Sequence, residues 1–286
     1  MAAHVEKTYQ ERILKILIHI QNHLDDALSL DDLAAVAFFS PFHFHRIFTA
    51  HTGESIQSYV RRLRLKRATQ DLVYTDLSII QIAERAGYDT QQSFHRAFKE
   101  TYHETPKTFR DKKLQILTQF NAEKKSLSAA VDLVEIKTLT PLKVAFVRQV
   151  GPYEHISKAW FPLVTEIGLT KMLSDDTLKI SIAYDAPDST AADKLRYDAC
   201  VLLDESSHFK PKGSIGTQTL HGGKYAVIIH RGAIETIEDT YRILFGLWLP
   251  QSGYEPADYP NFILHRKIPF QTPAKSLVTE IYLPLK

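Results

Sequence analysis

Two arginines stand at matching places in two similar stretches of the first hundred residues. Arg46 lies in the run FHRIF and Arg96 in the run FHRAF, 50 positions further along the chain. An arginine can donate two parallel hydrogen bonds to guanine, and a glutamine such as Gln92 can pair with adenine in the same way. These residue types therefore have the chemistry to read base-pair edges in the major groove of DNA.

Each arginine is expected on the second helix of a helix-turn-helix unit. In the first unit, Ser29 caps a short helix over residues 31–37, and Ser40 with Pro41 opens the next helix. In the second unit, Asp89 is expected to cap a helix that runs to about Thr101. Helical spacing turns the phenylalanines inward and the arginines outward. A repeated helix-turn-helix with an outward arginine predicts a DNA-reading device.

A stiff spacer is predicted between the two units. Residues 55–74 have helical periodicity, and about 20 residues at about 1.5 Å each give a rod of roughly 30 Å. That length is close to the roughly 34 Å of one turn of DNA, so two recognition helices could enter successive major grooves. The net charge of the chain is only +2, and the basic run over residues 61–67 is expected to supply a local basic stripe.

The segment from about Tyr9 to Lys113 resembles the AraC family of bacterial transcription regulators, through FFSPFHFHRIFTAHTG, YDTQQSFHRAFKETYH and TPKTFR. The resemblance implies an all-α DNA-binding domain over residues 1–113, with double-stranded DNA and RNA polymerase as partners. The base-contacting positions that it implies are Phe42, His45 and Arg46 in the first unit and Gln91, Gln92, Ser93 and Arg96 in the second. The aromatic Phe42 and His45 lead us to expect more sequence discrimination from the second unit.

A second domain of a different class is predicted after a linker over residues 114–130. Residues 131–286 alternate between strand and helix patterns, which indicates an α+β domain. Strands are expected over residues 131–137, 143–149, 180–184, 197–203, 225–230 and 276–283, with helices over 155–167 and 234–247.

This second domain contains an internal repeat. Residues 144–156 parallel residues 225–237 at an offset of 81, and each copy reads as a strand, a glycine-containing turn and a helix. The repeat predicts duplicated β-α-β-β units related by a pseudo-dyad, with a groove between them where small molecules commonly bind. Both tryptophans of the chain, Trp160 and Trp248, fall at or just past the repeat helices.

Residues 131–286 resemble the gyrase-inhibitory-protein-like (GyrI-like) effector-binding domain, through the repeat, GGKYAV, WLPQSGYE and EIYLPL. The resemblance implies a small-molecule effector, and the ligand-binding residues that we expect are Tyr153, Trp160, Trp248, Phe262, Ile263 and His265. The P-x-F-E-x-Y segment of such domains reads PNFILH here, so Ile263 and His265 replace a glutamate and a tyrosine. A buried carboxylate is what favours a cation, so we expect a neutral or anionic effector unless Glu235 or Glu255 substitutes.

Other classes of protein receive less support. Cys200 is the single cysteine, no apolar run approaches roughly 20 residues, and the first residues lack a signal-peptide core, so a cytoplasmic protein is expected without membrane contact. His19 and His23 share a helix face without a third ligand, which predicts no metal site. No phosphate loop, nucleophile elbow or triad is visible, so neither an enzyme nor a cofactor is expected.

The sequence thus predicts a multidomain, one-component transcription regulator, with an all-α half that reads DNA and an α+β half that senses a small molecule. The alternative is a protein that sequesters or hydrolyses a small molecule and binds DNA secondarily.

Overall fold

The structure is a computed structural model that describes residues 2–123, 133–174, 176–187, 190–204, 209–266 and 272–286. Its contacts divide the chain into two compact units. The first comprises residues 1–112 with 212–216, and the second comprises residues 113–211 with 217–286. The two-domain, all-α and α+β fold class is confirmed.

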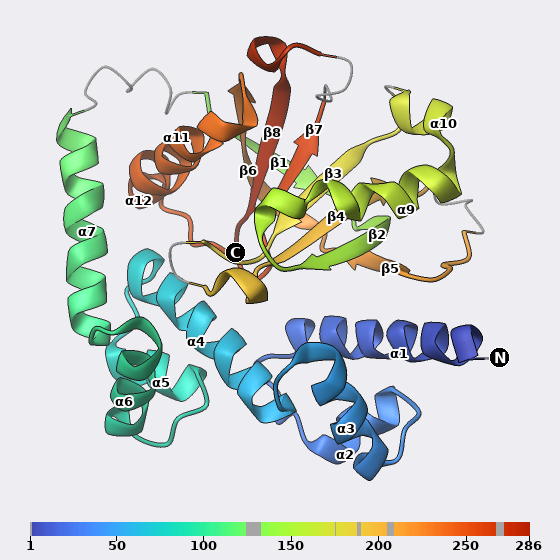
Figure 1. Cartoon of the computed structure of the whole chain (residues 1–286). Helices are drawn as coiled ribbons and strands as arrows, with labels where there is room; N and C mark the ends of the chain where they lie inside the picture. Colours follow the sequence, from blue (N-terminus) through green and yellow to red (C-terminus); the bar gives the residue numbers. More distant parts are fainter. Residues whose placement is uncertain (1, 124–132, 175, 188–189, 205–208, 267–271) are drawn as a thin grey trace. The chain divides into compact units, whose positions relative to one another are not determined.

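The first unit is built from helices, shown in blue to green in Figure 1. Their bounds are α1 Ala2–Asn22, α2 Leu30–Val36, α3 Pro41–Thr52, α4 Ile56–Tyr74, α5 Ile79–Arg85 and α6 Gln91–Tyr102. Helix α7 (Pro106–Glu123) begins in this unit and continues into the range 114–130. The pairs α2–α3 and α5–α6 form the two helix-turn-helix units.

Hydroxyl side chains start most of these helices. Ser29, Ser40, Ser55 and Ser78 each accept a hydrogen bond from the backbone N–H three residues later. Helix α6 is capped by Thr90, whose Oγ1 accepts from the Ser93 N–H at 3.1 Å. The prediction that Asp89 caps this helix is wrong, because Thr90 directly precedes the first helical residue and takes the extended conformation that a cap requires.

Helix α4 belongs to both hydrophobic cores of the unit. Its first half, from Ile56 to Leu63, packs with α1, α2 and α3 around Phe44 and Phe48. Its second half, from Leu65 to Leu72, packs with α5 and α6 around Phe94, Phe98 and Phe109. The four phenylalanines at matching repeat positions are all fully buried. One continuous helix therefore fixes the two helix-turn-helix units with respect to each other.

The second unit is an eight-stranded sheet in the order β1-β6-β8-β7-β3-β4-β2-β5. The strands are β1 Glu135–Leu139, β2 Leu142–Val150, β3 Lys179–Ala183, β4 Arg196–Leu202, β5 Ile215–Leu220, β6 Gly223–Arg231, β7 Phe262–His265 and β8 Val278–Pro284. Strands β5 and β7 were not expected from the sequence; β7 has only four residues, too few for a clear period-2 pattern.

The sheet is duplicated as the sequence repeat predicts. One copy runs β2-α9-β3-β4 and the other β6-α11-β7-β8, with α9 at Ser157–Ile167 and α11 at Ile237–Arg242. The order β6-β8-β7 is the reverse of β3-β4-β2, and the copies meet where Ser181 pairs with Ile263. Gly151 and Gly232 open the two turns with φ of 125° and 127°. Their N–H groups donate to the Leu195 and Leu277 carbonyls at 2.9 and 3.0 Å.

The strand that precedes each copy in the chain lies beside the first strand of the other copy. Strand β1 precedes β2 in the chain but pairs with β6, and β5 precedes β6 but lies beside β2. Helices α9 and α11 cover the same face of the sheet (Figure 1), because Trp160 of α9 contacts Tyr197 and Thr240 of α11 contacts His230. Further helical segments are α10 (Leu169–Leu173), a π-helical turn over Ile243–Trp248 and α12 (Leu249–Ser252). Short 3-10 turns lie at Tyr153–His155, Ala192–Lys194, Ile234–Thr236 and Ala274–Ser276.

Candidate functional site

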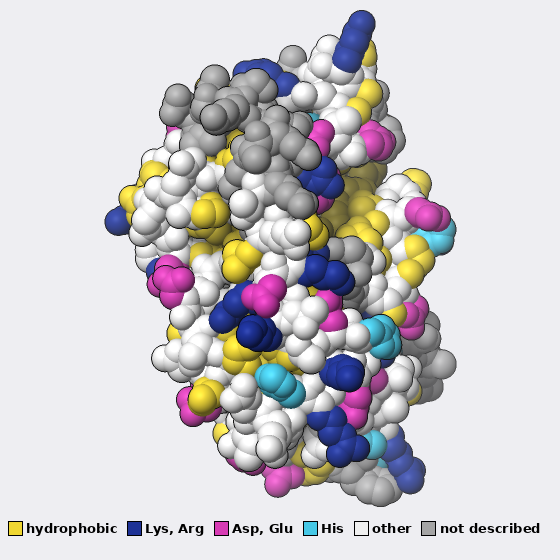
Figure 2. All heavy atoms as spheres, turned by 90° about the vertical axis from the view of Figure 1, so that its left-hand side faces the viewer, with side chains coloured by type: hydrophobic (Ala, Val, Ile, Leu, Met, Phe, Trp, Pro, Cys, Tyr) yellow, Lys and Arg dark blue, Asp and Glu magenta, His cyan; other side chains and the backbone are white. Residues whose placement is uncertain are grey.

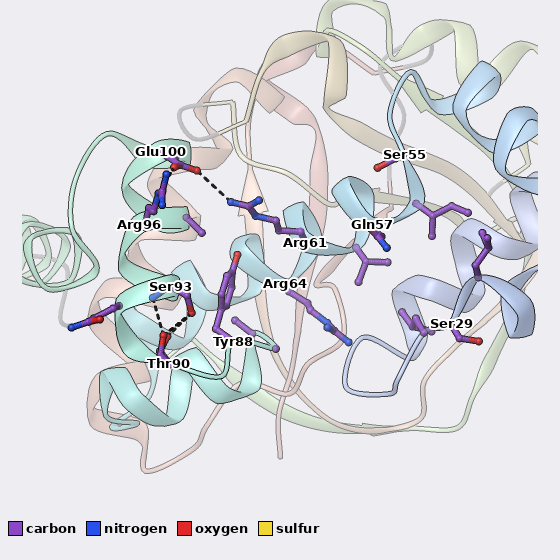
Figure 3. A pocket seen from close by; sticks show the side chains of 18 of the residues that line it. Ser29, Ser55, Gln57, Arg61, Arg64, Tyr88, Thr90, Ser93, Arg96 and Glu100 are labelled. Carbon is purple, nitrogen blue, oxygen red and sulfur yellow. Dashed lines mark hydrogen bonds and ion pairs between the residues drawn. The ribbon is translucent and has the colours of Figure 1, made fainter.

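A groove of about 1100 Å³ lies between the two helix-turn-helix units of the first domain (Figure 3). Helices α3, α4 and α6 all contribute to its lining, which includes His45, Gln57, Arg61, Arg64, Gln92, Ser93, Arg96 and Glu100. Four of the seven expected DNA-contacting residues therefore line one surface: His45, Gln92, Ser93 and Arg96. Gln91 and Arg46 are exposed on α6 and α3 outside this lining, and the Phe42 side chain lies outside the described residues.

Arg96 projects from α6 into this groove. Its side chain is 84% exposed, whereas Phe94 and Phe98 on the same helix are fully buried. Arg96 Nε donates to Glu100 Oε1 at 3.2 Å, and Arg61 Nη2 donates to Glu100 Oε2 at 3.4 Å. Figure 3 shows the two arginines reaching Glu100 from α6 and α4. Our reading of the sequence missed Glu100, although its spacing of four residues from Arg96 is the usual sign of such a pair.

The other polar side chains at the start of α6 are held close to the helix. Ser93 Oγ donates to the Thr90 carbonyl at 2.8 Å and accepts from Thr90 Oγ1 at 3.0 Å. The amide of Gln91 lies 3.4 Å from His95 Nε2. Gln92, Arg96 and Glu100 are thus the long polar side chains of α6 that line the groove.

The basic run of α4 does not form a stripe along one face. Three of its arginines are engaged inside the protein: Arg62 with Glu54 at 2.7 Å, Arg64 with the Leu24 and Asp26 carbonyls at 2.8 Å, and Arg67 with Asp25 at 2.7 Å. The predicted stripe is therefore wrong for Arg62, Arg64 and Arg67, since neighbouring residues of a helix point about 100° apart and these three reach different neighbours. On the face shown in Figure 2, basic and acidic side chains are interspersed.

A chain of four side chains lies on the helix-covered face of the second domain. Trp160 Nε1 donates to the Tyr197 hydroxyl at 3.3 Å. The Tyr197 and Ser181 hydroxyls are 2.6 Å apart, and Ser181 Oγ lies 2.7 Å from His265 Nε2. The rings of Trp160 and His265 meet edge to face at 6.3 Å. We name these four residues the central cluster.

The structure brings together four of the six expected ligand-binding residues. Trp160 and His265 belong to the central cluster, Ile263 pairs across from Ser181, and the Tyr153 ring meets that of Tyr197 at 6.4 Å.

The other two expected residues lie elsewhere. Phe262 is the neighbour of Ile263 on β7 and therefore lies on the opposite face of the sheet, where its ring stacks on that of Tyr282 with centroids 4.6 Å apart. The Trp248 ring stacks on that of Tyr254 with centroids 6.1 Å apart. Our reading of the sequence missed Ser181, because its place depends on the pairing of β3 with β7.

The central cluster is uncharged at neutral pH. Burial, with a smaller contribution from Lys179, lowers the pKa of His265 to about 4, and burial raises the pKa of Tyr197 to about 12. Glu235 and Glu255 are both exposed, and Glu255 pairs with Lys286 at 2.8 Å. Neither glutamate supplies the missing buried carboxylate.

The residues that the structure describes contain no group of three or more His, Cys, Asp or Glu arranged to hold a metal ion. No helix among them is long and apolar enough to cross a membrane.

Together these features define a double helix-turn-helix domain joined to a duplicated α+β domain. The chain belongs to the family that carries the GyrI-like small molecule binding domain, whose family model matches residues 133–286. A helix-turn-helix domain of AraC type matches residues 33–112. Both resemblances expected from the sequence are confirmed.

Curated relatives are similar to the first domain. YbfP, an uncharacterized HTH-type transcriptional regulator of Bacillus subtilis (strain 168), is 41% identical over 102 residues, which are 36% of this chain and 35% of the relative. The right origin-binding protein of Escherichia coli (strain K12) is 41% identical over 98 residues, 34% of each protein. The chain thus spans about a third of the length of the curated relatives it matches.

Solved structures are similar to about a third of the chain or to most of it. The C-terminal domain of AraT, a response regulator from Geobacillus stearothermophilus, is 31% identical and covers 35% of this chain and 84% of that chain, with a TM-score of 0.33. EcmrR in an EcmrR–DNA complex is 14% identical and covers 90% of this chain and 98% of that chain, with a TM-score of 0.46.

Proposed function

We propose that the protein is a transcription regulator that reads double-stranded DNA with its first domain and senses a small molecule with its second. The observation that carries this proposal is the groove lined by His45 of α3 and by Gln92 and Arg96 of α6. Helix α4 has 19 residues and is therefore about 28 Å long. A spacer of that length suits two recognition helices in successive major grooves.

We assign base contacts to Arg46, Gln91, Gln92 and Arg96, with Ser93 at the phosphate backbone, because a hydroxyl at a helix N-terminus is well placed for phosphate. Phe42 and His45 give the first recognition helix a weaker set of base-reading groups. The proposed domains are residues 1–113 and 131–286, with residues 114–130 between them. RNA polymerase is the further partner of a regulator of this type, and the cytoplasm is where its DNA would be found.

The test is a salt-titrated anisotropy measurement on a promoter fragment and on a scrambled fragment. Arg96→Ala should lose about tenfold to a hundredfold in affinity on the promoter, the effect of one bidentate contact to guanine, and much less on the scrambled fragment. Arg242→Ala, an exposed arginine of the second domain, is the matched control. Unchanged discrimination in Arg96→Ala would contradict the assignment.

We further propose that the second domain binds its ligand without transforming it. The contact between Ser181 Oγ and His265 Nε2 has the length that a hydrolytic dyad requires. Ser181 is buried, however, and its hydroxyl is shared with Tyr197. Release of nitrophenol from a nitrophenyl ester that disappears in Ser181→Ala would favour hydrolysis instead.

A further inference from the structure

The hydrogen bonds of the central cluster have one direction that satisfies every member. The indole N–H of Trp160 can only donate, so the Tyr197 oxygen accepts from it. If Tyr197 then donates to Ser181, and Ser181 donates to His265 Nε2, each hydroxyl donates once and accepts once.

The reverse direction leaves a buried donor unsatisfied. Ser181 would donate to Tyr197, and the Tyr197 proton would have no acceptor in the part of the chain that the structure describes. Tyr197 is only 6% exposed, and an unsatisfied buried donor is strongly disfavoured. The first direction therefore prevails, and it fixes the proton state of His265: Nε2 accepts, and Nδ1 carries the hydrogen.

His265 consequently ends the chain with an N–H donor. As whole residues, His265 and Trp160 are partly exposed, whereas Ser181 and Tyr197 are buried, so His265 and Trp160 form the outer end of the cluster. Because its pKa is lowered to about 4, His265 stays neutral and keeps this tautomer at physiological pH. A ligand that reaches His265 therefore meets a hydrogen-bond donor.

The charges nearest the cluster disfavour a cation. Lys179 pairs in register with His265 on the adjacent strand and donates to the Ser174 carbonyl at 2.6 Å. The carboxylate of Asp185 is held by Arg196 through two bonds of 2.8 Å. Ile263, an apolar residue, faces Ser181 at the centre. Asp198, a second buried carboxylate near Tyr197, is held by Arg148 at 2.7 Å, so the carboxylates on either side of the cluster are already paired with arginines.

We propose that the central cluster binds a planar neutral or anionic molecule whose carbonyl or carboxylate oxygen accepts from His265 Nδ1–H beside the Trp160 ring. The inference rests on the proposed function only in taking this domain as the small-molecule domain. It names the ligand class of that domain and does not depend on DNA binding.

A matched series of probes tests the charge preference. 2-Naphthoate, 2-naphthamide and 2-naphthamidine have nearly the same shape and carry negative, zero and positive charge. Binding to the full chain is followed by tryptophan fluorescence in a Trp248→Phe background, so that Trp160 is the reporter. The amide and the carboxylate should bind at least tenfold more tightly than the amidine.

Three variants make the test specific to these residues. Ile263→Glu places a carboxylate opposite Ser181 and should reverse the preference in favour of the amidine, whereas Ile263→Gln, of similar size, should not. His265→Phe removes the donor and should abolish the preference for an acceptor. If Ile263→Glu fails to fold, nitrogen NMR of the wild-type histidines decides alone, with Nδ1 protonated in His265 as the expected result.

Three results would overturn the proposal: tighter binding of the amidine to the wild-type protein, no fluorescence response to any of the three probes at millimolar concentration, or His265 protonated at Nε2. Each is measured without DNA. The proposed regulatory function fails separately, by loss of promoter discrimination, so the two failures are distinguishable.

Discussion

Arg96 and Arg61 share the carboxylate of Glu100, and this arrangement has a cost for DNA binding. The two ion pairs are exposed, with more than half of each side chain accessible. Such pairs contribute about 0–1 kcal/mol each, so phosphate can displace them. Glu100 nevertheless places a negative charge in the groove that we assign to DNA, where it repels the backbone.

Glu100→Gln should therefore raise affinity for scrambled DNA about threefold to tenfold at low salt, because it removes that repulsion. Affinity for the specific site should rise less, since Arg96 also loses the partner that orients it. The measurement is the ratio of the two dissociation constants. Glu104→Gln is the control, because Glu104 pairs with Lys112 and does not line the groove. Equal effects of the two substitutions would rule out this role for Glu100.

His265 makes a second prediction at the scale of one residue. Its pKa in the folded protein is about 4, below its ordinary value of 6.5, so below about pH 6.5 the unfolded chain binds a proton that the folded chain does not. The stability of the second domain should be complete above pH 6.5 and fall as pH decreases toward 4. A pKa shift of this size corresponds to a loss of at most about 3 kcal/mol.

Urea unfolding followed by tryptophan fluorescence measures this effect, since both tryptophans lie in the second domain. His265→Gln removes the titrating group and should flatten the profile between pH 6.5 and 4. His155→Gln, an exposed histidine of the same domain, should leave it unchanged. A profile that stays steep in His265→Gln would assign the acid sensitivity to another group.

Predictions for single residues were correct where helical spacing alone determines whether a side chain points inward or outward. Outward Arg96 and Gln92 and inward Phe94 follow from helical spacing alone. Ser181 and Tyr197 could not be paired in advance, because their contact depends on the register of β3 with β4 and β7. The basic run of α4 was misjudged for the same reason: Arg64 and Arg67 bind backbone and carboxylate groups far along the chain.

At the scale of elements, the two helix-turn-helix turns carry different residues at the position that takes the left-handed conformation. Gly87 in the second turn has φ of 79°, and Phe38, 49 positions earlier, takes φ of 56° while 80% of its surface is exposed. A left-handed conformation costs a residue with a side chain about 1–2 kcal/mol. Glycine avoids this steric cost but loses more backbone entropy on folding, so the net gain from glycine is smaller. The first turn is therefore strained without compensating packing.

Phe38→Gly should raise the free energy of unfolding of the first domain by about 0.5–1 kcal/mol. Phe38→Ala is the matched control: it removes the exposed ring but keeps the β-carbon, so the strain stays and no comparable gain is expected. Gly87→Ala should act in the opposite direction, because its β-carbon would lie 2.5 Å from Arg64 Nη1. Denaturant unfolding followed by circular dichroism measures all three, and stabilisation by Phe38→Ala equal to that by Phe38→Gly would contradict the backbone explanation.

The duplications of both domains were predictable because each leaves a nearly constant offset in the sequence, 49 to 50 residues in the first domain and 81 in the second. The offset of 81 predicted two strand-turn-helix copies, and the structure has them, with Gly151 and Gly232 at matching turns. The exchange of β1 and β5 between the copies was not predictable. A strand pattern specifies which side chains are buried but not which neighbour completes the ladder.

At the scale of the whole molecule, a regulator requires an energetic link between its two domains. If a ligand of the central cluster changes affinity for the promoter by some factor, then the promoter must change affinity for that ligand by the same factor. This reciprocity follows from thermodynamics and needs no assumption about how the two domains are arranged. It therefore tests regulation without any knowledge of the pathway between the sites.

We expect a coupling factor of about 5 to 150, the usual range for allosteric proteins. Promoter affinity is measured by anisotropy with and without saturating 2-naphthamide, and 2-naphthamide affinity by Trp160 fluorescence with and without saturating promoter. Arg96→Ala should reduce promoter affinity both with and without 2-naphthamide. His265→Phe should weaken the binding of 2-naphthamide and so reduce the change in promoter affinity that this ligand causes. If 2-naphthamide and the promoter both bind but neither changes the affinity for the other, the coupling factor is one and the domains act independently. That result would favour the alternative that the sequence left open, a protein that sequesters or hydrolyses a small molecule and binds DNA secondarily.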